Sequence, residues 1–328
     1  MSKTLKVFFI FFLISLLLSA CSPIAATQAP DQISVRLKWT HGVQFAGFYI
    51  ADQKGFFAEE NLSVNLREGG LEYDELDLVS DGQDDFGVVG GQTVVSARLN
   101  GYPIKAVATV FQISPAVYFS LAESGIERPE DFVGKRVMVF PSDTKLKIML
   151  KNVGVNMDQV IAVPPSTDLS SLYAGEEEVW AGYVTNQVVR ARLDGYEINV
   201  IYPEDFGIFE YGDCIITTDE LIQGNPDLIE RFIRAAMRGW RYAIENPAEA
   251  AQIASQYADI ENDTYLLASM EAQVPLIHNG AAPIGWMEFE DWQDMCDLFL
   301  PSDYCEDEFK TQDVFTLQFL NAVYGYEE

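Results

Sequence analysis

The chain has 328 residues, 48% of them hydrophobic, and this length exceeds one ordinary hydrophobic core, so two lobes are expected. Its 50 acidic residues outnumber 21 basic ones and give a formal net charge of −29, which argues against nucleic acid as a partner. We interpret this charge as a well-solvated acidic surface rather than a cation-binding site, because no histidine–cysteine cluster or calcium-loop spacing suggests a metal.

The first residues have the pattern of a removable export signal, residues 1–20, in which two lysines precede the apolar stretch Val7–Ala20. That stretch is shorter than the roughly 20 residues a membrane-spanning helix needs, so a permanent transmembrane anchor fits poorly. Leu18-Ser19-Ala20-Cys21 resembles a bacterial lipobox, which implies acylation of Cys21 and a membrane-anchored chain facing outside the cytoplasm. Residues 21–32, with two prolines and several small residues, then predict a flexible stalk.

From Ile33 onward the hydrophobic pattern switches repeatedly between the periods of strands and helices, which predicts an α/β fold. Strands are expected at 33–39, 63–66, 86–89, 104–111, 117–122, 136–139, 160–163, 179–183, 198–202 and 213–217. Helices are expected at 44–54, 73–79, 92–100, 144–153, 169–174, 186–194, 227–245, after Pro247, 263–273 and 288–300.

Three cysteines follow Cys21 in a compartment where disulfides can persist. Cys296 and Cys305 lie nine residues apart across a turn signal, and this spacing is compatible with a short-loop disulfide or with two thiols. Cys214 lies in an apolar run and is expected to be a buried thiol.

Four strand-to-helix transitions carry aromatic and amide side chains, at 39–45, 90–93, 111–115 and 183–187. Ligands of open α/β sheets gather beyond the carboxyl ends of strands, so a small-molecule site is expected there. The candidate ligand-binding residues are Trp39, His41, Gln44, Tyr49, Gly91, Gln92, Thr93, Gln112, Tyr183, Asn186, Gln187 and Tyr211. Aromatic faces and amides suit a flat ring of little or no charge.

Several of these signals have an alternative interpretation. Phe45 and Phe48 are expected to be core residues, and Trp39 could be either core or a ligand platform. His41 could be a hydrogen-bonded structural histidine, and the Gly90-Gly91 pair could be only a tight turn.

An enzymatic function has little support in the sequence. Gly-x-Ser-x-Gly, His-Glu-x-x-His and a phosphate-binding glycine loop are all lacking, and a histidine-based site could draw only on His41 and His278. We therefore expect a binding protein without a cofactor.

Longer motifs resemble the family of thiamine-precursor synthases and substrate-binding proteins that share the type 2 periplasmic binding fold. The resemblance spans residues 33–274 and rests on segments 37–49, 54–62, 85–87, 129–137, 183–186 and 225–228. It implies two lobes, each a mixed sheet flanked by helices, joined by a hinge. Lobe 1 would comprise residues 33–115 and 206–328, and lobe 2 residues 116–205.

The resemblance also implies a function. The chain would be a monomeric solute-binding lipoprotein that delivers a heteroaromatic vitamin to the permease of an ABC importer. A pyrimidine synthase using pyridoxal phosphate is the enzymatic alternative, although the synthases' cysteine-rich motif is lacking here. A sensory or adhesive surface lipoprotein is the third possibility.

The ligand class depends on one position within the resemblance. Family members usually carry Tyr-x-x-Asn-Glu where this chain has Tyr183, Asn186 and Gln187. An amide both donates and accepts hydrogen bonds, so it fits the imide edge of a flavin better than an acid does. We therefore rank riboflavin first, a thiamine-precursor pyrimidine second, and a sulfonate or nitrate lower because no arginine lies at the four transitions.

Overall fold

The computed structural model describes residues 29–140, 144–258, 260, 262–278, 280, 282–300 and 311–326. The chain divides into two units, Met1–Pro30 and Asp31–Glu328, and the fold concerns the second. The predicted signal peptide, Cys21 and Cys305 lie outside the described residues.

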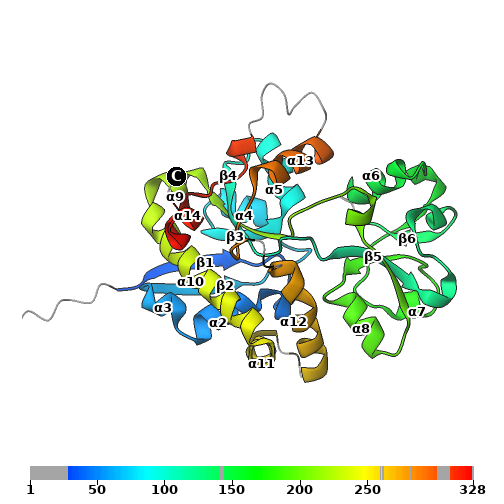
Figure 1. The fold of residues 1–328 in the computed structure, drawn as a ribbon, viewed down its shortest axis with the longest axis horizontal. Coiled ribbons are helices and arrows are strands. Elements are labelled where there is room, and N and C mark those ends of the chain that lie inside the picture. Colours follow the sequence, from blue (N-terminus) through cyan, green and yellow to red (C-terminus); the bar gives the residue numbers. More distant parts are fainter. Residues whose placement is uncertain are drawn as a thin grey trace, which may run out of the picture. The chain divides into compact units, whose positions relative to one another are not determined.

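The first lobe is built on a five-stranded mixed sheet with the order β2-β1-β3-β10-β4. Its strands are β1 Asp31–Arg36, β2 Leu62–Arg67, β3 Phe86–Gly90, β4 Ile104–Thr109 and β10 Asp213–Thr218. β1 runs parallel to β2 and β3, whereas β10 runs antiparallel to β3 and β4. A late segment of the chain thus completes a sheet begun by the early strands (Figure 1).

Helices cover this sheet and bury its apolar side chains (Figure 1). The helices of the first lobe are α2 Ala46–Gln53, α3 Phe56–Glu59, α4 Glu75–Ser80, α5 Gly91–Leu99, α9 Asp219–Gly224, α10 Pro226–Glu245, α11 Pro247–Ala258, α12 Asp263–Ile277, α13 Phe289–Phe299 and α14 Gln318–Tyr324. In the part of the chain that the structure describes, none of the helices is long and apolar enough to cross a membrane.

The long helix α10 shows how local signals set this architecture. The Asn225 side chain accepts the backbone N–H of Leu228, and Pro226 occupies the first turn, so the helix begins where the sequence predicts. Its apolar face packs on α2, α3 and α14, and Phe232 stacks on Phe86 at 4.1 Å between ring centroids.

The second lobe has its own strands and its own hydrophobic core. β5 Ala116–Leu121 lies between β8 Trp180–Tyr183 and β9 Ile198–Ile201, antiparallel to both. β6 Arg136–Met138 and β7 Ile161–Val163 pair in parallel, and a bridge from Val137 to Val179 joins the two sheets. The parallel and antiparallel pairs thus lie in separate sheets of this lobe. The helices are α6 Thr144–Asn152, α7 Ser170–Tyr173 and α8 Gln187–Leu193.

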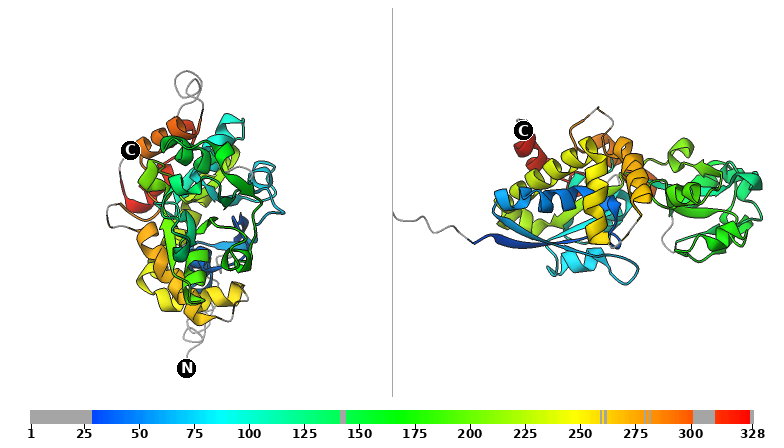
Figure 2. Two further views of the ribbon diagram at one scale, coloured as in Figure 1. Left: turned by 90° about the vertical axis from the view of Figure 1, so that its right-hand side faces the viewer. Right: turned by 90° about the horizontal axis from the view of Figure 1, so that it is seen from below.

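Two segments cross between the lobes, residues 110–115 and 202–212, and together we call them the hinge (Figure 1, Figure 2). Three backbone hydrogen bonds tie the hinge at the first lobe: Val110 N–H to Asp213 C=O at 2.7 Å, Gly212 N–H to Phe111 C=O at 2.9 Å, and Ser114 N–H to Glu210 C=O at 2.9 Å. The two crossing segments are therefore hydrogen-bonded to each other where they leave the first lobe.

Several expected boundaries were wrong, among them one at the stalk and two at strand ends. The stalk does not extend to residue 32, because Asp31 and Gln32 already pair with Leu62 and Ser63 in β1. The first strand ends at Arg36 rather than at residue 39, and the fourth ends at Thr109 rather than at residue 111. At the ends of both strands the chain leaves the sheet before its apolar pattern stops, because residues beyond a strand also pack against the core.

Several side chains were expected from the sequence to be buried. Phe45 and Phe48 are buried in the core of the first lobe, as expected, and Cys214 is a buried thiol. Cys296 is buried in α13, but its expected partner Cys305 is outside the described residues, so that disulfide stays a prediction.

Candidate ligand-binding site

Polar side chains from both lobes meet where β1 and β3 end and β10 begins. Lys38 follows β1, and Asp213 opens β10 opposite Gly90, the last residue of β3. Tyr183 comes from the end of β8 in the second lobe, and the Lys38 Nζ atom lies 5.5 Å from the centre of its ring. The lobes therefore approach each other at this point.

Asp213 contacts two other polar side chains of this group, and its own side chain is only 2% exposed. Its Oδ1 atom lies 3.5 Å from Lys38 Nζ, and its Oδ2 atom accepts a hydrogen bond from Gln44 Nε2 at 2.6 Å. Burial raises the pKa of Asp213, while Lys38 and Gln44 act to lower it. Both neighbours are donors, so the ionised carboxylate is the form that satisfies all three side chains.

Lys38 stays charged in this position. Burial by itself lowers the pKa of Lys38, but Tyr183, Asp213 and Glu210 raise it by more, so the net shift is upward. The ammonium group is thus a permanent charge of the site.

A second ion pair lies beside the first. Glu210 Oε2 accepts from Lys145 Nζ at 2.7 Å, and Glu210 Oε1 accepts the backbone N–H of Gln92 at 3.1 Å, in the first turn of α5. Burial raises the pKa of Glu210, but Lys145 and Lys38 lower it by more, so the carboxyl ionises more readily than usual. Because Lys145 belongs to α6, this pair links the second lobe to the hinge.

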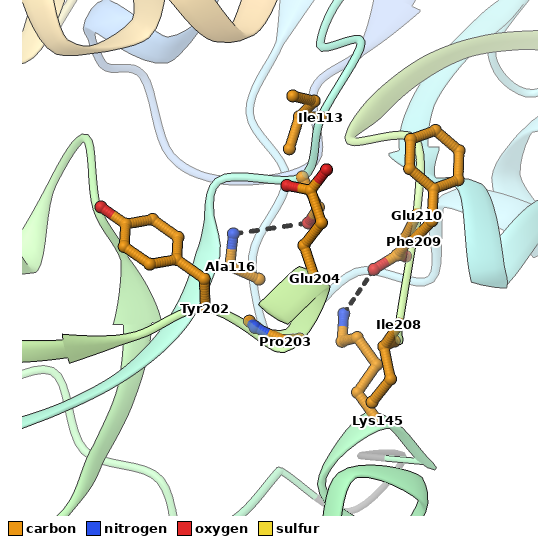
Figure 3. Close-up of a pocket in the computed structure, with 10 residues that line it drawn as sticks. Ile113, Ala116, Lys145, Tyr202, Pro203, Glu204, Ile208, Phe209 and Glu210 are labelled. Atoms are coloured by element: carbon orange, nitrogen blue, oxygen red, sulfur yellow. Dashed lines mark hydrogen bonds and ion pairs between the residues drawn. The ribbon is translucent and has the colours of Figure 1, made fainter. Parts of the chain in front are cut away.

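A cavity of about 20 Å³ lies beside this pair (Figure 3). Both hinge segments line it, through Ile113 and Ser114 on one side and Ile208 to Glu210 on the other. A space of this size holds about one water molecule. It is part of the hinge rather than a site for a ring-sized ligand.

The amides of the second lobe are already engaged within the protein. Gln187 Oε1 accepts the backbone N–H of Tyr183 at 2.9 Å, which fixes the orientation of the amide and of its Nε2 donor group. Asn186 Oδ1 accepts the hydroxyl of Tyr265, on α12 of the first lobe, at 2.6 Å. The expectation that Gln187 offers both a donor and an acceptor to a ligand stays a prediction, with one acceptor position of Oε1 already used within the protein.

His41 and Tyr49 form one unit of the first lobe. The His41 Nδ1 atom lies 2.9 Å from the Tyr49 hydroxyl, and burial lowers the pKa of His41 despite the opposing effect of Glu68. The Tyr49 ring is fully buried and stacks on Tyr257 at 4.1 Å, so its expected ligand contact is wrong. Tyr49 instead holds the loop that carries His41, while Trp39 is half-buried against the lobe core.

The glycine pair at the start of α5 makes room for protein atoms. A Cβ atom on Gly90 would lie 3.1 Å from Glu210 Oε1 and 3.3 Å from Lys38 Nζ, and one on Gly91 would lie 3.0 Å from the carbonyl oxygen of Tyr211. Close approach was expected there, and in this structure both ion pairs use it. The half-buried Thr93 follows in the first turn of α5.

One further expected contact is wrong, that of Tyr211. Tyr211 is 1% exposed, its hydroxyl donates to Asp291 Oδ2 at 2.5 Å, and that hydroxyl accepts the backbone N–H of Glu288. Gln112 directs its Nε2 group to the carbonyl oxygen of Trp286 at 2.9 Å. Late segments of the chain pack over Tyr211, whereas Gln112 is partly exposed and its contact with a ligand stays a prediction.

Four charged residues of this site were not expected from sequence: Lys38, Lys145, Glu210 and Asp213. For two of them, Lys38 and Asp213, the sequence contained a pattern that could have indicated a site residue. Lys38 interrupts apolar neighbours at the end of a buried strand, and Asp213 directly precedes the apolar run Cys214-Ile215-Ile216. Among the described residues there is no cluster of three or more histidine, cysteine, aspartate or glutamate side chains that could hold a metal ion.

The two-lobed arrangement has a counterpart among solved structures and defines the class of fold. The periplasmic aliphatic sulphonate-binding protein SsuA of Escherichia coli superposes with a TM-score of 0.69, at 13% sequence identity, over 87% of this chain and 91% of that one. The fold is that of the type 2 periplasmic binding proteins.

Within that fold, residues 43–250 match the family described as NMT1/THI5 like, and the chain belongs to this family. The formylaminopyrimidine-binding protein of Halalkalibacterium halodurans is 24% identical, covering 92% of this chain and 95% of that protein. The riboflavin-binding protein RibY of Chloroflexus aurantiacus is 28% identical, with 77% and 78% covered. A Legionella pneumophila relative, 26% identical with 71% and 75% covered, is named 4-amino-5-hydroxymethyl-2-methylpyrimidine phosphate synthase.

Proposed function

We propose that this chain is the solute-binding component of an ABC importer and that it binds a flat heteroaromatic molecule between its lobes. The observation that carries the proposal is the meeting of Lys38 from one lobe with Tyr183 from the other, beside an amide on each side, Gln44 and Gln187. A site divided between two hinged lobes can couple binding to closure. A permease could then recognise the closed form.

Riboflavin is the first candidate ligand. The Nε2 group of Gln187 is a donor whose orientation is held by the contact between Oε1 and the Tyr183 N–H, and a carbonyl of the flavin imide could accept from it. Tyr183 offers an aromatic ring at the same place. The relative named for riboflavin binding supports this choice.

An aminopyrimidine is the second candidate, because the formylaminopyrimidine-binding relative aligns with 92% of this chain. Its smaller ring would need fewer contacts in the same cleft. The synthase named for another relative is not the function proposed, since the sequence begins with an export signal and lacks the synthases' cysteine-rich motif.

The location is part of the proposal. We infer that the chain is a monomer held at the outer side of the cell membrane by acyl groups on Cys21, and this rests on the signal and lipobox pattern alone. Incorporation of labelled palmitate into the full-length chain, and its loss in Cys21→Ser, would be the expected result. An unlabelled wild-type chain would refute the anchor.

The ligand is tested with protein lacking residues 1–21. We expect riboflavin to bind with a dissociation constant of about 1 μM or lower, roughly −8 kcal/mol, and its fluorescence to be quenched by stacking. Calorimetry against riboflavin and formylaminopyrimidine separates the two candidates. Failure of both to bind at about 100 μM would refute the proposal.

The Gln187→Glu variant tests the donor. It keeps an acceptor for the Tyr183 N–H but removes Nε2, so riboflavin binding should weaken about tenfold, or roughly 1.4 kcal/mol. Gln159→Glu is the matched control, because Gln159 Oε1 likewise accepts a local backbone N–H, that of Asn156 at 2.9 Å. Equal effects of the two variants would remove Gln187 from the site.

A further inference from the structure

Lys38 and Lys145 lie in the region where the lobes meet, around Asp213, Tyr183 and Glu210, which we call the cleft, and each lysine is paired with a carboxylate that is far less exposed than the lysine itself. The Lys38 side chain is 29% exposed and its partner Asp213 2%, while the Lys145 side chain is 21% exposed and its partner Glu210 5%. The cations thus reach toward solvent and the anions lie behind them. The formal charges of the four groups cancel.

Both carboxylates are held by donors on two sides. Gln44 and Lys38 contact the two oxygens of Asp213, and the Gln92 N–H and Lys145 contact those of Glu210. Neither acid can turn away from its lysine without leaving a buried donor unpaired, which is costly. The cancellation is therefore a property of the two folded lobes and the hinge together rather than an average over mobile side chains.

We propose that Asp213, by neutralising Lys38, makes this cleft selective for uncharged ring ligands and excludes their phosphorylated forms. The inference rests on the proposed function only in that a heteroaromatic ring must bind here. Lys38 by itself would be a natural phosphate-binding group, being a cation next to an aromatic ring at the carboxyl end of a strand. Asp213 already accepts from that ammonium group, so an incoming phosphate would meet a paired cation and a buried negative charge behind it.

The same geometry predicts what the removal of one charge would do. Asp213→Asn keeps the size of the side chain and an acceptor for Gln44, but it leaves Lys38 without its counter-ion at this position. An unpaired cation in a partly buried site favours an anionic ligand. The variant should therefore turn a site for neutral rings into one that tolerates phosphate.

The experiment compares two pairs of probes on protein lacking residues 1–21: riboflavin with riboflavin 5′-phosphate, and 4-amino-5-hydroxymethyl-2-methylpyrimidine with its phosphate. For the pair whose neutral member binds, we expect the phosphorylated member to bind about 100-fold more weakly to the wild type. In Asp213→Asn this ratio should fall about tenfold, and in Asp213→Asn/Lys38→Met the fall should disappear. Asp219→Asn, which removes the partner of Arg98 in the same lobe, is the control and should leave the ratio unchanged.

The outcomes are distinct. If both members of a pair bind the wild type equally, or if Asp213→Asn leaves the ratio unchanged, the selectivity proposal is wrong while the proposed function stands. If no probe binds the wild type, both are wrong. Should Asp213→Asn fail to fold, Glu210→Gln tests the same principle at Lys145, and an unchanged ratio there overturns it.

Discussion

Tyr265 holds the two lobes together at a contact separate from the ion pairs, and its removal should weaken ligand binding. Its hydroxyl donates to Asn186 Oδ1 at 2.6 Å, and the Arg190 guanidinium carbon lies 4.3 Å from the centre of its ring. Asn186 and Arg190 belong to the second lobe, at the start of and within α8, whereas Tyr265 is on α12 of the first. The contact joins the two lobes, so it stabilises the arrangement in which they meet.

The magnitude follows from the groups that change. Tyr265→Phe keeps the ring under Arg190 and removes one hydrogen bond, which contributes about 1 kcal/mol because half-buried Asn186 can bond to water instead. If closure is linked to binding, the dissociation constant should rise by up to about fivefold. Tyr265→Leu also removes the cation–π contact, about 0.5–1 kcal/mol more, for a combined factor of about 10 to 30.

Stopped-flow dissociation of the bound ligand measures this effect, since weaker closure should appear mainly as faster release. Tyr173→Phe is the matched control, because the Tyr173 hydroxyl contacts Asp194 at 2.8 Å entirely within the second lobe. The reasoning is refuted if Tyr265→Phe releases ligand no faster than the wild type, or no faster than Tyr173→Phe.

Two further predictions concern the first lobe. Gly47→Ala should lower the free energy of unfolding in urea by about 1–3 kcal/mol, because its Cβ would lie 2.1 Å from the buried ring of Trp240. Gly224→Ala is the control and should have no such effect, because its Cβ meets no atom within 4 Å. Equal urea midpoints for the two variants would contradict the helix packing. His41 has a lowered pKa through burial, so the stability it contributes is complete above its unfolded pKa of about 6.5 and is lost as the pH falls toward the folded value. His41→Gln should flatten the stability profile below about pH 6.5, and an unchanged slope would refute the assignment.

Much of the secondary structure could be predicted because its causes are local. Alternation from Ile33 marks β1, and the Asn225-Pro226 pair marks the start of α10. Side-chain period and capping depend on residues a few positions apart, so they are visible in the sequence. Boundaries were less accurate where apolar residues such as Leu37 continue past the end of a strand into the core.

The residues predicted for the site fall into two groups in the structure, and the site itself stays a prediction. Gln44 and Tyr183 do lie at the meeting of the lobes, whereas Tyr49 and Tyr211 have the same residue type and are buried in the core. An aromatic residue near a strand end has the same local pattern in both cases. Whether such an aromatic side chain is covered depends on α11 and α13, which come much later in the chain and pack on Tyr49 and Tyr211.

The sequence alone determined the alternation of strands and helices and the family motifs, since each follows from residues close together in the chain. The tertiary structure decided how the charges pair. Lys38 and Asp213 are 175 positions apart, and Asn186 and Tyr265 are 79 apart. Burial and charge cancellation depend on such distant partners, so only the folded chain reveals that the cleft carries two balanced ion pairs and a separate contact between its lobes.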